Sequence, residues 1–354
     1  MRVTLLTRRL DDRPTNGFER YAHNLRSGLR SMSVDVNLPC QRSPLPVRPS
    51  GSVMSPVYYD IFLSAWRLIR GEMDSDVVHA LTDSQAFFFP FLRGKKVVTF
   101  HHVDKTPPGS LQERIFCWFY SVGTRLSLKH ADHFICISEQ TRNEVMDAYG
   151  VLKEKITVIP QAIPEVFQPR KVAKEGWTVG YIGALKKRKN VEALIRGFSK
   201  AKSMSNYHDM RLVICGEGPD EAALRDMAID LGDSVEFRGL VPEERLVETY
   251  NSFDMFVFPS FQEGFGFPIL EAQACGLPVL TMEGAMIPEE VSRHTLKCAG
   301  EQGLADTILR LREDIKLRQK MSEMGIHYAA TFSVKAMAER TYSVYQRLFD
   351  GNPR

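Results

Sequence analysis

The sequence predicts an α/β protein of two doubly wound domains. Short apolar runs with the length of buried strands alternate with longer segments of helical periodicity. The 354 residues suffice for two domains at roughly 100–200 residues each. A stretch with three prolines, 159–173, separates two strand–helix series, so we expect a linker there. Two such domains predict a binding cleft between them.

The first domain is expected to span 1–165. Its predicted strands are Arg2–Leu6, Val77–Ala80, Lys96–Phe100 and Asp132–Ile137. Its predicted helices are 18–31, 111–130 and 139–148. The first helix follows from the helical spacing of Phe18, Tyr21, Leu25 and Leu29. The segment 41–56, rich in Pro, Ser and Arg, is predicted to be a loop.

The second domain is expected to span 166–333. Its predicted strands are Thr178–Ile182, Arg211–Cys215, Ser234–Phe237, Met255–Phe258 and Pro278–Thr281. Its predicted helices are 190–203, 219–231, 243–252 and 268–275. Strands that alternate with helices indicate a parallel sheet. A last helix, Val334–Phe349 within 334–354, is expected to pack back on the first domain.

Charge and cysteine content exclude several classes of protein. The formal net charge of +3 gives no reason to expect a nucleic-acid partner. The six cysteines form no CxxC pair, and Cys136 and Cys215 sit in apolar runs, which favours a reducing compartment. The first apolar stretch is too short for a secretory signal, and Pro90 interrupts the longest aromatic run. We therefore expect a soluble, cytoplasmic protein.

The segment Glu263–Pro278 carries the most information. Gly264 and Gly266 allow a tight turn and a close approach of backbone to a ligand. Pro268 suits the first turn of a helix, and Gly276 is a natural terminator. A strand end that leads through glycines into a helix offers N–H groups to an anion such as a diphosphate.

Two glutamates flank this helix start, Glu263 in the loop and Glu271 in the helix. Carboxylates there can accept hydrogen bonds from sugar or ribose hydroxyls, whereas two solvated surface glutamates are the alternative. The stretch resembles the EGFG-x(4)-E-A-x-A-CG-x-PV signature of the retaining GT-B glycosyltransferases, family 4. The resemblance implies that Glu263 lies near the donor sugar and Glu271 holds the ribose, with Gly264, Phe265 and Gly266 as substrate-binding neighbours.

A basic cluster, Lys186–Lys189, follows Gly183 after the first strand of the second domain. Cationic side chains there can neutralise the charge that builds on a leaving diphosphate, although basic clusters are usually solvated. The run resembles the family's G-x-L-x-x-x-K-N element, which implies that Lys189 contacts the diphosphate. The family often has arginine where this chain has Ala184, and Arg188 is the candidate replacement.

His101 and His102 end a strand of the first domain, where a side chain can hydrogen-bond a substrate hydroxyl or serve a structural role. The position resembles the family's T-x-H-D, with His102 in place of aspartate. His101 is the first candidate for a catalytic residue, His102 a substrate-binding one, and Asp104 a weaker acceptor base.

Three further elements have weaker signals. Gly17 lies between the first strand and helix, where the family has a glycine loop. Gly216 belongs to a strand-ending C-G-E-G-P that resembles the family's G-x-G-P, which implies contact with the nucleotide. The backbone of Leu240 and Val241 is implied to meet the base.

Metal and cofactor motifs point elsewhere. Asp74-Ser75-Asp76 has the form of a metal-binding DxD, but it precedes its strand, so chance is the better explanation. A GxxxxGK[ST] loop is absent, and no GxGxxG follows the first strand, which argues against a dinucleotide oxidoreductase. We expect no metal and no cofactor.

The resemblance implies a GT-B fold, with two Rossmann-like domains that face a central cleft. The implied reaction is metal-independent, retaining hexosyl transfer from a nucleoside-diphosphate sugar to a hydroxyl. GDP-mannose is the favoured donor, which would make the protein a mannosyltransferase, with UDP-glucose or another UDP-sugar next. The expected acceptor is a bacterial or archaeal surface glycan, such as a lipopolysaccharide or a polyprenyl-linked chain.

Membrane contact at the inner face is a further expectation. Arg20, Arg26 and Arg30 make the first helix basic, and the helix around Trp118 is aromatic. Core packing is the favoured interpretation for Trp118 and Phe119. Two other functions stay open: a nucleotide-sugar 2-epimerase on the same fold, and a non-catalytic sugar-nucleotide-binding or scaffold protein.

Overall fold

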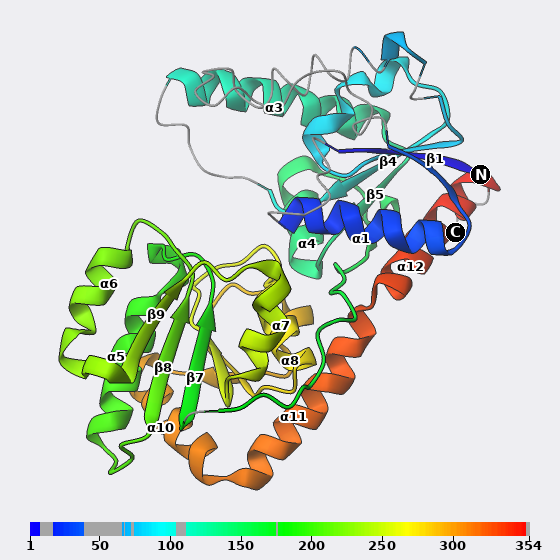
Figure 1. Cartoon of the computed structure of the whole chain (residues 1–354). Helices are drawn as coiled ribbons and strands as arrows, with labels where there is room; N and C mark the ends of the chain where they lie inside the picture. The colour runs from blue at the N-terminus through cyan, green and yellow to red at the C-terminus, as the bar shows by residue number, and fades with distance from the viewer. Residues whose placement is uncertain are drawn as a thin grey trace. The chain divides into compact units, whose positions relative to one another are not determined.

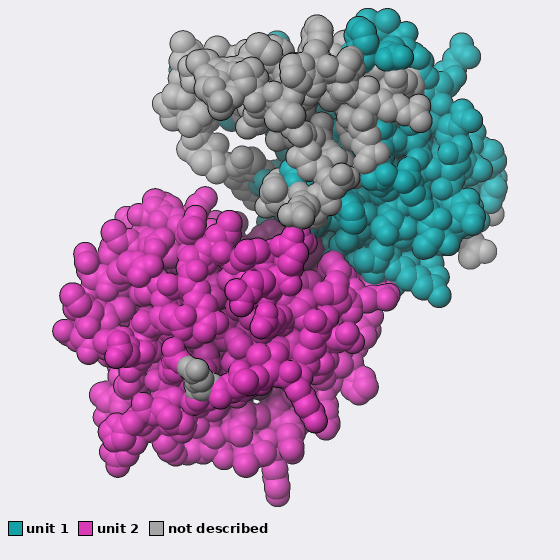
Figure 2. Space-filling model, viewed as in Figure 1, with its two compact units in different colours: residues 1–162, 334–354 teal, residues 163–333 magenta. Residues whose placement is uncertain are grey.

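The computed structural model describes residues 1–7, 17–38, 66, 68–71, 74–103, 111–174 and 176–351. Two compact units divide the chain. Unit 1 comprises residues 1–162 together with 334–354, and unit 2 comprises 163–333. Figure 2 shows unit 1 in teal and unit 2 in magenta. The predicted loop 41–56 and Asp104 lie outside the described residues.

Unit 1 is built on a six-stranded parallel sheet in the order β2-β1-β3-β4-β5-β6. The strands are β1 (Arg2–Leu6), β2 (Asp35–Asn37), β3 (Val77–Ala80), β4 (Lys95–Phe100), β5 (His133–Cys136) and β6 (Ile156–Val158). The helices are α1 (Gly17–Ser31), η2 (Asp83–Phe91), α3 (Leu111–His130), α4 (Glu139–Tyr149), η3 (Lys153–Lys155) and α12 (Val334–Phe349). The apolar strands place their side chains in cores on both faces of the sheet.

The last helix completes a core of unit 1. Met337, Ala338, Val344 and Tyr345 of α12 are buried in one cluster with strand residues and α1. Gly28 of α1 permits this close approach, since a Cβ there would lie 2.6 Å from the Cβ of Ala338. In Figure 1 the red helix α12 is drawn next to the blue helix α1. Unit 1 is therefore made from two segments that are far apart in the sequence.

Unit 2 contains a second six-stranded parallel sheet in the order β12-β11-β10-β7-β8-β9. The strands are β7 (Trp177–Ile182), β8 (Met210–Cys215), β9 (Val235–Gly239), β10 (Met255–Phe258), β11 (Val279–Met282) and β12 (Leu296–Cys298). The longer helices are α5 (Val191–Ser203), α6 (Glu221–Met227), α7 (Glu243–Asn251), α8 (Phe267–Ala274), α10 (Gly300–Glu313) and α11 (Ile315–Ala329). The short elements are η4 (Lys187–Lys189), η5 (Ile229–Ser234), α9 (Glu289–Ser292) and η6 (Ala330–Phe332).

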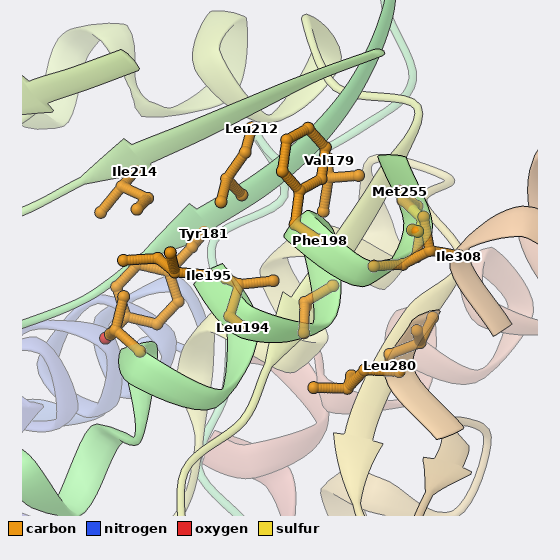
Figure 3. Close-up of a cluster of buried hydrophobic side chains, with 14 of the residues drawn as sticks. Val179, Tyr181, Leu194, Ile195, Phe198, Leu212, Ile214, Met255, Leu280 and Ile308 are labelled. Carbon is orange, nitrogen blue, oxygen red and sulfur yellow. The ribbon is translucent and has the colours of Figure 1, made fainter. Parts of the chain in front are cut away.

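The principal core of unit 2 lies between its sheet and helices α5 and α10. Figure 3 shows Tyr181, Leu212 and Ile214 of the sheet gathered with Leu194, Ile195 and Phe198 of α5. Phe198 and Leu194 have no exposed area. Full burial of one such side chain contributes roughly 1.5–3 kcal/mol. This packing fixes α5 against β7 and β8, and so fixes the loop that joins β7 to α5.

The predicted α/β fold with two parallel sheets is confirmed, and most expected elements begin and end within two residues of the observed ones. Of the strands and longer helices, those that were not predicted are β2, β6, β12, α10 and α11. The three strands have three residues each and lie at sheet edges, and the two helices follow β12. Among the described residues, no helix is both long and apolar enough to cross a membrane.

The core-packing interpretation of Trp118 is wrong, because its side chain is 60% exposed on α3. The helix was predicted correctly, but its length and periodicity do not say which apolar residue faces out. Trp118 lies on the solvent side of α3.

Candidate active site

The candidate residues of unit 2 meet where the strand order of its sheet reverses. From β7 the chain proceeds to β8 and β9 on one side, while β10, β11 and β12 lie on the other. Strands β7 and β10 are therefore neighbours, and the loops after them leave the same edge of the sheet. In open α/β sheets, ligands bind outside the carboxyl ends of strands at such a reversal. Lys189 and Glu263 belong to these two loops.

A buried ion pair joins the two loops. The Nζ atom of Lys189 lies 2.5 Å from Oε1 of Glu263, and each residue is only 8% exposed. The ring centroid of Phe258, the last residue of β10, lies 4.9 Å from the same Nζ atom, so the ammonium group also faces an aromatic ring. Residues that are 74 positions apart in the sequence thus form one charged centre.

Other contacts fasten the same two loops together. The carbonyl oxygen of Arg188 accepts a hydrogen bond from the backbone N–H of Phe261 at 2.9 Å. The Arg188 guanidinium donates to the carbonyl of Gln262 at 3.0 Å and lies 3.4 Å from Oε2 of Glu263. Ser260, which is fully buried, donates its hydroxyl proton to Oε1 of Glu263. The Glu263 carboxylate is therefore held by Lys189, Arg188 and Ser260 together.

Burial and charge act in opposite directions on Lys189. Removal of the ammonium group from water lowers the pKa of Lys189, and the adjacent Glu263 carboxylate raises it in part. The arginine beside it and Lys186 lower the pKa further. Residues 186–189 are all cationic, and Glu263 is the one carboxylate paired with them in the described contacts. The centre therefore has a positive net charge, which attracts an anion.

Glycines close the neighbouring strand ends. The backbone N–H of Gly183 donates to Cys215, and the N–H of Gly216 donates to Gly239 at 2.7 Å. Gly216 has φ of +137°, and a Cβ there would lie 1.9 Å from the Gly183 carbonyl oxygen. Leu240 directly follows Gly239 and is 72% exposed, and Val241 is half-buried. The predicted residues Gly183, Gly216, Leu240 and Val241 thus share one edge of the sheet.

Helix α8 begins as the sequence predicts. Gly266 precedes it with φ of +104°, Pro268 is in its first turn, and Gly276 follows it with φ of +79°. Gly264 is exposed, whereas Phe265 is 4% exposed and packs edge-on against Phe267. The glycine turn after Glu263 therefore opens to solvent at one residue and is anchored by an aromatic core at the next.

Glu271 lies deeper than Glu263. Its side chain is 2% exposed, and its Oε2 accepts a hydrogen bond from the hydroxyl of Tyr250 on α7 at 2.7 Å. The described contacts do not bring Glu271 together with Lys189 or Glu263. Tyr250 was not singled out in the sequence, because an apolar-face tyrosine of a helix gives no signal of a polar partner.

The candidate site of unit 1 has a different character. His101 directly follows β4 and is 7% exposed. Its ring packs edge-on against Phe18 at 4.7 Å and Tyr21 at 4.9 Å, both on α1. Burial lowers the pKa of His101 to about 3, so the imidazole is neutral near pH 7.

The hydrogen bonds of His101 fix which nitrogen carries the proton. Its Nε2 lies 2.9 Å from the carbonyl oxygen of Leu81, which can only accept, so Nε2 donates. The other nitrogen, Nδ1, is then an acceptor and faces the side-chain amide nitrogen of Gln161 at 3.4 Å. The Gln161 oxygen points elsewhere, and it is buried without a hydrogen-bond partner among the described residues. An unpaired buried acceptor costs about 1–3 kcal/mol.

A buried chain of hydroxyls supports this region. His79 of β3 contacts the Tyr345 hydroxyl at 2.6 Å and the Thr99 hydroxyl at 2.7 Å. Thr99 in turn lies 3.0 Å from the Tyr21 hydroxyl, and the Tyr21 ring contacts His101. Burial lowers the pKa of His79 to about 3. The chain links α12, β3, β4 and α1 through neutral groups.

The other predicted residues of unit 1 lie around His101. His102 is exposed, and its ring centroid is 6.0 Å from that of Phe18. Gly17 is the first residue of α1 and directly precedes Phe18. Sequence reasoning missed Asp83, a buried carboxylate that accepts hydrogen bonds from Tyr120 at 2.6 Å and Thr124 at 2.7 Å. Burial raises the pKa of Asp83, and these hydrogen bonds and His102 oppose that rise.

The DxD string serves the opposite edge of the unit 1 sheet. Asp76 accepts a hydrogen bond from the backbone N–H of Arg2 at 2.7 Å, and Ser75 contacts Thr4 at 2.6 Å. Ser75 and Asp76 directly precede β3, so both lie at its amino-terminal end. Within the described residues, no group of three or more His, Cys, Asp or Glu side chains has an arrangement that would hold a metal ion.

Comparison with protein families decides the identity. The model for glycosyl transferases group 1 matches residues 162–328, and the model for glycosyltransferase family 4 matches residues 15–165. Together these two matches cover both units. The chain belongs to the group 1 / family 4 glycosyltransferases. As a glycosyltransferase it is a transferase enzyme, and its two parallel sheets with flanking helices form the GT-B fold.

Individual proteins resemble the glycosyltransferase over most of its length. The O-antigen chain mannosyltransferase B of Escherichia coli is 26% identical over 81% of each chain. Other curated relatives match over less of their own length, 56% and 23% in two cases. Among solved structures, WaaG, a glycosyltransferase involved in lipopolysaccharide biosynthesis, has a TM-score of 0.71 at 17% identity, with 98% of this chain and 99% of that chain covered. Anabaena HepE in complex with UDP and glucose has a TM-score of 0.70 at 18% identity, with the same coverage.

Four residues of the glycosyltransferase were missed in the sequence: Ser260, Tyr250, Gln161 and Asp83. Ser260 directly follows Pro259 at a strand end, which is a detectable signal of proximity to the site. The other three depend on contacts between distant segments, such as Gln161 with His101 across 60 positions.

Proposed function

We propose that this glycosyltransferase moves a hexose, mannose in the first instance, from a nucleoside-diphosphate sugar to a hydroxyl of a glycan or polyprenyl-linked glycan, with retention and without a metal. The observation that carries the proposal is the Lys189–Glu263 pair at the strand-order reversal of unit 2. This location and its positive charge suit a diphosphate. The Escherichia coli relative is an O-antigen chain mannosyltransferase, which supports mannose and a surface glycan.

In this proposal Lys189 and Arg188 stabilise the diphosphate as it departs. Negative charge grows on the leaving group in the transition state, so preorganised cations lower the barrier more than they tighten substrate binding. Glu263 orients Lys189 and lies next to the transferred sugar. Gly183, Gly216 and Gly264 form a glycine edge, where the protein backbone can approach the nucleotide closely. Leu240 and Val241 are proposed to contact the nucleobase. Phe265 and Gly266 are proposed to support the loop from behind.

Glu271 has the proposed role of a ribose contact. Its carboxylate already accepts one hydrogen bond from Tyr250, and a carboxylate can accept several. In unit 1, His102 is the proposed contact to a sugar hydroxyl, with Gly17 at the start of α1. His101, whose two ring nitrogens already face the Leu81 carbonyl and the Gln161 amide, is proposed to position this part of the site. The departing phosphate would take the acceptor proton.

A transfer assay tests the proposal. GDP-mannose and UDP-glucose are each incubated with the enzyme and a polyprenyl-linked saccharide, in buffer with and without EDTA, and nucleoside diphosphate and product are quantified. We expect release of GDP coupled to an extended glycan, at the same rate with EDTA, and an α-linked product by NMR. Lys189→Ala with full activity would contradict the role of the charged centre.

The same assay separates the other functions. An epimerase would change the sugar of the donor and leave no free nucleotide coupled to a glycan product. A non-catalytic binding protein would gain thermal stability with a nucleotide and form no product. A thermal-shift screen with GDP, UDP, ADP and their sugars ranks the donors. At equal concentrations, the ligand with the lowest Kd raises the melting temperature most, because stabilisation grows with the logarithm of ligand concentration divided by Kd.

The site of action is proposed to be the inner face of a membrane, where a polyprenyl-linked acceptor would be presented. Arg30 is exposed on α1, and Trp118 is exposed on α3. Cationic and aromatic side chains both favour an anionic lipid surface. Cosedimentation with anionic and with neutral vesicles measures this contact, which Arg30→Glu should weaken for anionic vesicles.

A further inference from the structure

Next to the candidate histidine of unit 1 lies one buried polar atom that has no hydrogen-bond partner among the described residues. Gln161 is 3% exposed, its amide nitrogen faces Nδ1 of His101, and its oxygen Oε1 has no hydrogen bond. The orientation of this amide is determined by chemistry. Because the Leu81 carbonyl requires a proton on Nε2, Nδ1 needs a donor, and only the NH₂ end of Gln161 can supply one.

The backbone around Gln161 is fixed on both sides. The N–H of Ile159 donates to Cys136 of β5 at 2.9 Å, and the carbonyl of Ala162 accepts from the Asn24 side chain of α1 at 3.0 Å. The backbone on both sides of Gln161 is therefore held in place. Buried polar groups without partners are rare in native proteins, and those that persist are often tied to function.

We infer that Gln161 is a further substrate-binding residue, whose side-chain oxygen accepts a hydrogen bond from a sugar hydroxyl next to His101; this rests on the proposed function. A hydroxyl satisfies an unpaired acceptor, and a site that binds it in this way discriminates against a sugar that lacks it. Phe18 packs edge-on against the His101 ring and is itself 43% exposed. The donor hexose and the acceptor glycan are the two possible sources of the hydroxyl.

The substitution Gln161→Leu removes the oxygen and keeps the approximate volume. We expect the melting temperature to change little, because the unpaired oxygen is removed while Nδ1 of His101 loses its donor. We expect kcat/KM to fall by about tenfold or more.

Gln273→Leu in unit 2 is the matched control. Gln273 is 1% exposed, its oxygen also lacks a partner within the part of the chain that the structure describes, and it packs on Gly325 of α11. Its substitution should likewise change stability little and leave the discrimination among substrates unchanged.

Monodeoxy analogues locate the hydroxyl. GDP-mannose (UDP-glucose if that is the donor) and each of its monodeoxy forms are compared in wild type and Gln161→Leu, and the same is done with an octyl mannoside acceptor and its monodeoxy forms. One analogue should lose about tenfold or more in kcat/KM with wild type and nothing further with Gln161→Leu. A hit in the donor series or in the acceptor series names the source.

Two results would overturn the inference. If every deoxy penalty is the same in Gln161→Leu as in wild type, the oxygen does not contact the sugar, and a buried water satisfies it instead. If the variant loses stability with no change in kcat/KM, Gln161 is structural. A wild-type enzyme that transfers from neither nucleotide sugar would instead refute the proposed function, and this is distinguishable because it precedes any comparison with the variant.

Discussion

The two units share one architecture, but the candidate site of unit 2 is charged and that of unit 1 is neutral. Each has six parallel strands, and in each the candidate residues follow the carboxyl ends of strands. Unit 2 places a buried ammonium–carboxylate pair there, whereas unit 1 places a neutral imidazole, an amide and hydroxyls. The fold therefore fixes the position of a site, while a few side chains decide whether that site suits an anion or a neutral hydroxyl.

The largest expected effect is on the charged centre of unit 2. Lys189→Met should reduce transfer by about 10²–10³-fold, because a preorganised charge at the leaving group is lost. It should also destabilise unit 2 by up to about 3–5 kcal/mol, because the buried Glu263 carboxylate loses its nearest cation and keeps only Arg188 and Ser260 as partners. Denaturant unfolding and initial rates measure the two effects.

The double variant Lys189→Met/Glu263→Gln separates the loss of activity from the loss of stability. It should recover much of the stability and none of the activity. Lys187→Met, at an exposed neighbouring position, is the control and should leave the stability near that of wild type. Equal stability of Lys189→Met and Lys187→Met would mean that the pair is solvated, and the contrast between the units would be lost.

Acid should destabilise unit 1 in particular. His79 and His101 have pKa values of about 3 when folded and near 6.5 when unfolded, so the unfolded chain binds more protons between these values. Stability should therefore be full above pH 6.5 and fall as the pH drops toward 3, by about 1.4 kcal/mol per pH unit for each histidine. The histidines of unit 2, His208, His294 and His327, are not buried.

Hydrogen exchange at a series of pH values resolves the two units. The peptides of unit 1 should lose protection first as the pH falls. The variant His79→Gln should show a shallower fall than wild type, even though it starts from lower stability. Equal acid sensitivity in both units would show that neutral burial does not set unit 1 apart.

The glycine edge of unit 2 provides a smaller effect. Gly216→Ala places a Cβ 1.9 Å from the Gly183 carbonyl at a backbone angle that favours glycine, so we expect a loss of at least about 1–3 kcal/mol and weaker nucleotide binding. Gly232→Ala is the control, since its φ is +52° and nothing lies within 4 Å of its Cβ. It should lose stability from strain alone, and its nucleotide affinity, measured by calorimetry, should match wild type.

The smallest expected effect is a shift in the pH at which nucleotide affinity is lost. Burial lowers the pKa of Lys189 and Glu263 raises it, so Glu263→Gln should lower it further. Because the charged lysine binds the diphosphate, the alkaline loss of GDP or UDP affinity should begin at a lower pH in Glu263→Gln than in wild type. Calorimetric titrations at several pH values check this, and an unmoved or raised midpoint would contradict the coupling of the two groups.

The sequence predicted unit 2 better than unit 1, for a physical reason. A turn that needs glycine at Gly266, or a proline in a first helical turn at Pro268, is local and leaves a pattern in consecutive residues. The approach of Lys189 to Glu263 also followed from strand order, once the reversal between β7 and β10 was known.

The neutral site of unit 1 depends on contacts that no local pattern encodes. Gln161 meets His101 from a segment after β6, a three-residue edge strand that was not predicted. His79 finds Tyr345 at a distance of 266 residues. Such pairs follow from packing of the finished fold, and only the strand-end position of His101 was visible in advance.

The return of α12 to unit 1 has a consequence for synthesis of the protein. Helix α12 supplies Tyr345 and buried apolar side chains to a unit whose other part was translated first. Unit 2 is continuous, so it can fold as soon as it leaves the ribosome. The nascent 1–162 segment must wait, with an incomplete core and an exposed apolar face, until α12 emerges. A chaperone that binds exposed apolar surface should therefore engage the earlier-made half of the chain for longer than the later-made half.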